Sequence, residues 1–296
     1  MHIGLTQKQE KIAYKTFDQI DENRNPKTMA TEKDLSASQN EVKPVGRFAA
    51  WFITLYDVFK FIGRFFKEAF LPPYELKELV RQCYEIGYRS ALLISTTGFI
   101  TGLVFTKQSR PSLSEFGATS WLPSLVGIAL LRTLAPLLTG LIAAGKVGSS
   151  IGAELGSMKV SEQIDAMEVS ATNPFKFLVS TRVLAATITM PILTFYTAMV
   201  GMLGALLNVS VNEGTSATTF FQSSLESITY LDIIASTVKA ILFGFTIAIV
   251  GCYQGYNSSK GTEGVGKAAN SSVVIAMFLI FVEEVVCVQI FSLFNT

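Results

Sequence analysis

The sequence has 296 residues, of which 49% are hydrophobic and only 16% are charged, against about 25% charged residues in ordinary soluble domains. Its net charge of +1 gives no indication of nucleic-acid binding, and its single histidine, His2, argues against histidine-based catalysis and most histidine metal sites. The three cysteines, Cys83, Cys252 and Cys287, are odd in number and lie in or beside apolar runs, which favours reduced packing residues over disulfides. No cofactor is expected.

The chain begins with a polar stretch of mixed charge, residues 1–44, which is typical of a flexible tail and lacks the apolar core of a signal peptide. In residues 45–89 we expect interfacial helices. Aromatic and aliphatic residues between 48 and 66 recur at helical spacing, with charges on the other face, as in a helix lying in a membrane interface. Pro72 and Pro73 end this first helix, and a second amphipathic stretch leads into the apolar part of the chain.

Five later runs are apolar enough to cross a bilayer, because a spanning helix needs about 20 mostly apolar residues. Residues 183–212 contain no charge, and residues 116–145 contain only Arg132. The predicted fold is an all-α polytopic membrane protein with one membrane domain, residues 45–296. Its spans are placed at about 90–106, 118–145, 177–208, 233–256 and 268–293.

The distribution of lysine and arginine predicts the orientation, since these residues concentrate in cytoplasmic loops. The segment before the first span is rich in both, and the loop between spans 3 and 4 has neither. Between spans 2 and 3, and between spans 4 and 5, basic residues return: Lys146, Lys159, Lys176, Arg182, Lys260 and Lys267. The N-terminal tail is therefore expected in the cytoplasm and the C-terminus on the far side.

A row of small residues runs through the end of span 2 at a spacing of four, comprising Gly140, Ala144, Gly148, Gly152 and Gly156. Small residues at this spacing allow another helix to approach closely within a membrane. We therefore expect span 2 to continue as one helix to about Met158 and to pack tightly on a neighbour.

A short charged helix is predicted next, from Ser161 to Val169, with Ser161 as its cap. Val160, Ile164 and Met167 share one face, and the acids Glu162, Asp165 and Glu168 point elsewhere, as does Gln163. The residues leave two interpretations open. The helix is either a docking element for a soluble partner or a solvated connector between two spans.

Two further features carry chemical interest. Residues 261–268, "GTEGVGKA", approach the P-loop pattern, but Ala268 replaces the hydroxyl that would reach Mg²⁺, and the segment follows an apolar span, so a flexible glycine-rich loop is favoured. Glu283 and Glu284 lie in the last apolar run, where ionisable groups are costly. With Arg132 and Lys239 they form a candidate intramembrane polar site, or they simply lie near the membrane interface or pair with Lys239 or Arg132.

The stretch "GKVGSSIGAELGSMKVSEQIDAMEVSATNP", residues 145–174, closely resembles the signature of the MlaE-type permeases, the membrane subunits of MCE-associated lipid ABC transporters. The family reads roughly G-R-V-G-S-x-I-x-A-E-[LI]-G-x-M-x-x-[ST]-E-Q-[IL]-x-[AS]-[ML]-E. "TRVLA" at 181–185 and the block at 251–274 are also similar to the family pattern. The sequence departs from it at Thr133, where the family has an acid, and at Glu284, where it has aspartate.

The resemblance implies a homodimeric permease of an inner membrane that moves phospholipid or a related lipid and hydrolyses nothing itself. It also implies a cytoplasmic ABC ATPase, a periplasmic MCE-domain protein and, for some members, a small STAS-domain protein. The ATPase would meet the short helix at Val160, Glu162, Gln163, Ile164, Asp165, Met167 and Glu168. The main alternative is an ion-coupled secondary transporter that uses Glu283 or Glu284, although the chain shows no internal repeat. A membrane-embedded enzyme has little support, since no nucleophile–base set is apparent.

Overall fold

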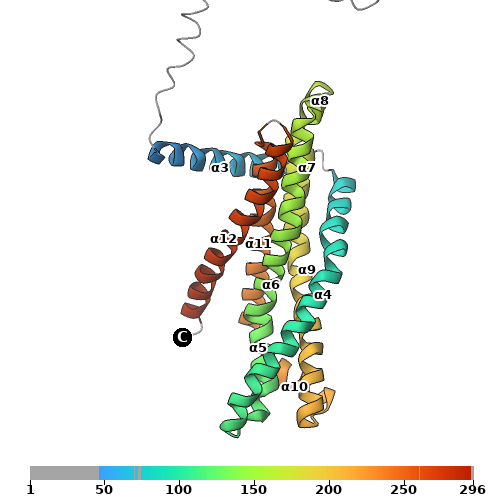
Figure 1. The fold of residues 1–296 in the computed structure, drawn as a ribbon, viewed down its shortest axis with the longest axis vertical. Helices are drawn as coiled ribbons and strands as arrows, with labels where there is room; N and C mark the ends of the chain where they lie inside the picture. The colour runs from blue at the N-terminus through green and yellow to red at the C-terminus, as the bar shows by residue number, and fades with distance from the viewer. Residues whose placement is uncertain (1–46, 70, 73–74, 260, 295–296) are drawn as a thin grey trace, which may run out of the picture. The chain divides into compact units, whose positions relative to one another are not determined.

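The computed structural model describes residues 47–69, 71–72, 75–259 and 261–294, and the predicted tail of residues 1–44 lies outside them. The chain divides at Asp57 into two units, the second of which runs from Val58 onward. Of the first unit, the structure describes only the beginning of helix α3 (Arg47–Ala69). The second unit is helical throughout its regular elements in the described ranges (Figure 1).

Within the described residues, five helical segments are long and apolar enough to cross a membrane: Leu76–Glu115, Thr119–Val160, Phe175–Glu213, Tyr230–Tyr256 and Thr262–Leu293. This confirms the predicted fold class. The first segment is α4 (Leu76–Glu115), which joins the predicted second amphipathic stretch to the first span in one helix of 40 residues. The charges near its start do not interrupt it, because charged side chains can point outward without disturbing the backbone hydrogen bonds of a helix.

The second segment is continuous but not uniformly α-helical. It consists of α5 (Leu122–Ala129), the π turn η2 (Leu130–Leu134), α6 (Ala135–Ala143), the π turn η3 (Ala144–Gly148) and α7 (Ser149–Val160). A one-turn 3₁₀ helix, η1 (Thr119–Trp121), precedes it. Span 2 therefore continues as far as the glycine row predicted.

The remaining elements follow from local signals. After α8 (Gln163–Val169) and the π turn η4 (Phe175–Ser180), helix α9 (Thr181–Glu213) ends at Gly214, whose φ of 63° suits a glycine after a helix. Ser216 caps α10 (Ala217–Glu226) by accepting a hydrogen bond from the Thr219 backbone N–H. Thr229 and Asp232 form a capping box at the start of α11 (Tyr230–Tyr256).

The last helix, α12 (Thr262–Phe294), begins within the segment expected to be a flexible loop. Gly261, at a φ of 98°, makes the turn that precedes it. Gly264 lies so close to the Ser259 carbonyl that a side chain would collide with it. These glycines therefore serve a tight turn and a close approach, and the expectation of a flexible loop over residues 261–268 is wrong.

The core of the second unit is formed mainly by α7, α9 and α11, with residues such as Leu155, Val183 and Phe243 fully buried. The apolar part of α11 is 61% buried, but that of α12 is only 22% buried. Helices α8 and α10 lie at opposite ends of the spans (Figure 1). The short helix that carries the predicted partner contacts is thus at the end where α7 and α12 also have charged residues.

Candidate functional site

The short helix α8 is held between two residues in the left-handed backbone region, Glu162 with φ 57° and Ala171 with φ 58°. Such a conformation costs an L-residue about 1–2 kcal/mol. Ser161 is not the cap of this helix, contrary to the sequence prediction. It ends α7, and its hydroxyl donates to the Ser157 carbonyl at 2.8 Å, because the left-handed residue that follows turns α8 away.

The apolar face of α8 packs against its own chain. Ile164 is only 1% exposed and belongs to the main core, and Met167 packs against that core. Ile164 is therefore not accessible to a partner, while Val160 is partly buried and its predicted contact with a partner stays a prediction. The outer face is polar and exposed at Glu162, Gln163, Asp165 and Glu168, and Asp165 accepts from Lys159 at 2.9 Å. The structure therefore anchors α8 firmly and leaves its acids accessible.

The row of small residues faces α11 and α12. A Cβ added at Gly140 would meet the Phe243 ring at 3.0 Å, and one at Gly152 would meet the Ser272 hydroxyl at 2.5 Å and the Ala268 carbonyl at 3.0 Å. Gly148 has more room, since the nearest atom would be 3.6 Å away. The contact with neighbouring helices that the row predicts is present, and it is tightest towards Gly152.

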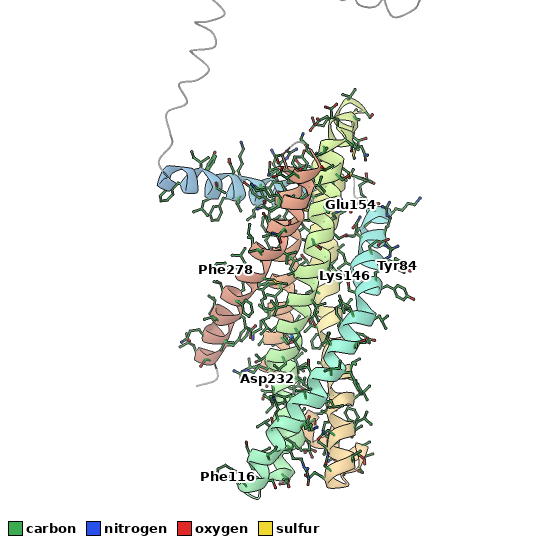
Figure 2. The ribbon with its side chains drawn as sticks, in the orientation of Figure 1. Tyr84, Phe116, Lys146, Glu154, Asp232 and Phe278 are labelled. Carbon is green, nitrogen blue, oxygen red and sulfur yellow. The ribbon has the colours of Figure 1, made fainter. Side chains whose placement is uncertain are left out.

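Of the four residues in the candidate polar site, Lys239, Glu284 and Arg132 lie next to one another. The Lys239 ammonium, only 1% exposed, donates to Glu284 at 2.6 Å and to the carbonyl of Arg132 at 3.1 Å. The Arg132 guanidinium lies 3.7 Å from the Asp232 carboxylate, the same carboxylate that caps α11. The buried Lys239–Glu284 pair is costly to desolvate, so removing either partner would lower the stability of the fold. Asp232 is labelled in Figure 2.

Glu283 lies apart from this pair. One of its carboxylate oxygens accepts from the Thr246 hydroxyl on α11. Its other oxygen, like the second oxygen of Glu284, is buried without a hydrogen-bond partner among the described residues. The two adjacent glutamates thus face different partners, and only Glu284 is paired with a cation.

A family model described as "Permease MlaE" matches residues 79–290 of the chain. The chain belongs to the MlaE permease family. A probable ABC transporter permease of Rickettsia prowazekii is 37% identical over 239 residues, which cover 81% of this chain and 92% of that protein. One of Synechocystis is 36% identical over 236 residues, covering 79% and 89%. The protein trigalactosyldiacylglycerol 1 of Arabidopsis thaliana, a chloroplast protein, is 29% identical over 215 residues, covering 73% and 61%.

In this MlaE permease the two departures from the family pattern occur at the charged cluster. Thr133 supplies no carboxylate next to Arg132, but Asp232 of α11 lies within ion-pair distance of the arginine. Glu284 replaces an aspartate and still reaches Lys239. The longer side chain and the acid from another helix therefore keep the cations of the MlaE permease partnered.

Sequence reasoning also missed the ion pair of Arg182 in this MlaE permease. Arg182, at the start of α9 and only 2% exposed, lies 2.8 Å from Glu154 of α7 and donates to the Leu178 carbonyl. Glu154 is the one charge in residues 147–158 of the first motif, and Arg182 is the one charge in residues 181–185 of the second. Because an isolated charge in such a helix needs a partner, opposite charges on adjacent spans were the available signal.

Proposed function

We propose that the chain is the permease subunit of an ABC transporter that moves phospholipid or a related lipid between an inner membrane and a periplasmic MCE-domain partner. A separate cytoplasmic ATPase supplies the energy, and the permease catalyses no reaction. Membership of the MlaE family and relatives named as ABC transporter permeases support this assignment. A relative whose name is that of a galactolipid supports a lipid as the substrate.

The observation that carries the proposal is the construction of α8. Ile164 and Met167 fix the helix to the core, so a force applied to α8 acts on the ends of α7 and η4 rather than on a loose loop. The exposed acids Glu162 and Glu168 are free of ion pairs shorter than 4 Å with any described residue, and can form the charged part of a contact with a basic surface. Charged groups at the rim of an interface mainly guide association and orientation.

The proposal includes the orientation and assembly. The α8 end lies in the cytoplasm, the C-terminus lies in the periplasm, and α3 rests in the membrane interface, where Phe59 and Phe66 are exposed apolar groups. The permease acts as a pair of identical subunits, as the family resemblance implies. A STAS-domain protein, where one exists, joins the ATPase side of the assembly.

The alternative function, an ion-coupled transporter, has weaker support. Glu284 is already neutralised by Lys239, so it is not available as an independent ion-binding carboxylate. Glu283 keeps one unpartnered oxygen among the described residues, which is a reason to include its variant in transport assays. ATP-dependent transport that survives Glu283→Gln would leave the alternative without support.

The proposal is tested by Glu162→Arg. This change reverses a charge on α8 and leaves the left-handed backbone conformation equally costly, because both residues carry a side chain. We expect the variant to fold but to capture less ATPase in a pull-down, and to lose most lipid-dependent ATP hydrolysis after reconstitution. Because Glu162 would lie in the charged rim of the contact, its reversal should act mainly by slowing association with the ATPase and changing its salt dependence.

A matched control is Glu226→Arg on α10, an exposed glutamate at the opposite end of the spans. It should assemble and hydrolyse ATP normally. Normal assembly and hydrolysis of the Glu162→Arg protein would show that α8 is only a connector. Transport itself is measured as ATP-dependent loss of labelled phospholipid from proteoliposomes that contain the ATPase and the MCE-domain protein.

A further inference from the structure

A polar pocket lies between α4 and the η3–α7 segment, near the end of the spans that carries α8. Its volume is about 340 Å³, and its basic lining residues are Arg81, Arg89 and Lys146. Two carboxylates, Glu85 and Glu154, and the exposed Ser150 also line it. Figure 2 shows Lys146 and Glu154 on the second span, with Tyr84 on the neighbouring α4.

The charges of this pocket are unequally compensated. Lys146 donates to the backbone carbonyl of Arg89, and no carboxylate of the described residues lies within 4 Å of its ammonium group. The other ionised groups are paired: Arg81 with Glu78 at 3.4 Å, Arg89 with Glu85 at 2.7 Å, and Glu154 with Arg182 at 2.8 Å. Among the described residues of the pocket, Lys146 is thus the cation without an ion pair within 4 Å.

The backbone brings Lys146 to this position through the π turn η3, of which it is the third residue. A π turn changes the direction in which the following side chains point, and such turns are common at functional sites. Of the residues on either side, Gly145 is partly buried and Val147 is buried. Lys146 and Val147 of this turn both line the pocket against α4, and Lys146 is the charged one of the two.

The pocket lies at the boundary between charged and apolar parts of α4. Arg89 is the last charge before residues 90–106, which contain none. Tyr84 and Tyr88 form an exposed stacked pair with ring centres 5.0 Å apart, and exposed tyrosines are typical of the membrane–water interface. Just beyond them Leu92 is 80% exposed. A polar pocket thus opens at the level of headgroups, next to an apolar surface at the level of acyl chains.

We propose that this pocket binds the phosphate headgroup of an anionic phospholipid from the membrane leaflet on the α8 side. Lys146 supplies the uncompensated charge, and Arg81 and Arg89 supply further donors once the phosphate competes with their carboxylate partners. The acyl chains follow the exposed face of α4 past Leu92. The inference concerns binding by the permease alone. It can therefore fail while the transport proposal stands, and the reverse also holds.

The test uses the full-length permease purified in detergent and native mass spectrometry. The protein is offered equal amounts of phosphatidylglycerol and phosphatidylcholine with the same acyl chains. We expect wild-type protein to retain phosphatidylglycerol preferentially, and Lys146→Met to lower that preference about fivefold, the contribution of one lysine near an anionic lipid surface. Lys146→Arg keeps the charge and should keep the preference. Lys267→Met removes an exposed lysine of α12 near its start, outside the pocket, and should change nothing.

Melting in the same detergent reports whether each variant is folded. If Lys146→Met is not recovered folded, Ser150→Glu places a carboxylate in the pocket while Lys146 remains, and the same loss of preference is expected. An unchanged preference in the folded pocket variants would overturn the proposal, as would an equal loss in Lys267→Met. Displacement of phosphatidylglycerol by millimolar inorganic phosphate would assign the pocket to free phosphate and would also overturn it.

Discussion

At the scale of single residues, the molecule depends on charges that find partners across helices. Lys239 of α11 is enclosed with Glu284 of α12, and the buried Arg182 of α9 pairs with the exposed Glu154 of α7. The sequence predicts that isolated charges in apolar runs have partners, and it offers Lys239 as one partner for the glutamates. It does not predict which of the two adjacent glutamates is chosen, because that depends on how α12 is rotated against α11.

The pair of Lys239 and Glu284 leads to a prediction for stability. Lys239→Met leaves a buried carboxylate without its cation, and removing one partner of a buried ion pair typically costs about 3–5 kcal/mol. In the double variant Lys239→Met/Glu284→Leu no charge remains unpaired, so most of that stability should return. Thermal unfolding in detergent of both single variants and the double variant measures the coupling. Losses that simply add would contradict this account of the pair.

At the scale of elements, the closest helix contact is between α4 and α9. Gly102 and Gly204 have almost no space for a side chain, because they face the backbone carbonyls of Gly201 and Phe99 respectively. The sequence predicts close packing for span 2, where five small residues follow one another at a regular spacing. In α4 and α9 the signal is shorter, a single pair at the same spacing, Gly98 and Gly102, and it does not name α9 as the partner. The surface that a glycine faces follows only from the tertiary structure.

We therefore predict that Gly102→Ala is strongly destabilising. The added methyl group would overlap the Gly201 backbone, which cannot move aside as a side chain can. Overpacking of this kind typically costs about 1–3 kcal/mol. Gly87→Ala on the same helix is the matched control, since its methyl group would lie 3.8 Å from Thr189 in ordinary contact. We expect a lower melting temperature for Gly102→Ala alone. Equal melting of the two variants would show that α4 and α9 separate easily.

At the scale of the whole molecule, apolar run length was sufficient to predict the five membrane-crossing segments, because uncharged stretches of this length have few other uses. Run length could not predict where the helices begin and end. α4 extends well before its apolar part, and α12 starts inside a glycine-rich segment. In both places the backbone hydrogen bonds of the helix continue through polar residues, so the polarity of the side chains does not mark the helix end. The direction of the chain across a membrane remains a prediction from its lysines and arginines.

The proposed orientation is tested by labelling single cysteines in a variant that lacks Cys83, Cys252 and Cys287. Ser216, at the start of α10, and Thr262, at the start of α12, are both exposed. We expect a membrane-impermeant maleimide to label Ser216→Cys in intact cells and to label Thr262→Cys only after permeabilisation. The reverse pattern would invert the proposed orientation, and with it the side on which an ATPase could reach α8.

The π turn η3 has a consequence for the phase of the small-residue row. In an α-helix, four residues overshoot a full revolution by about 40°, so a row with that spacing winds around the helix. A π turn takes more residues per revolution. Four residues in it therefore turn through less than a full revolution, and the row shifts in the opposite direction. Because η3 lies between Ala144 and Gly148, the row still meets both α11 and α12 beyond it. Deleting one residue within η3 would therefore restore regular α-helix and leave Gly152 facing α12, whereas deleting one residue from the regular helix α6 would rotate Gly152 by about 100°.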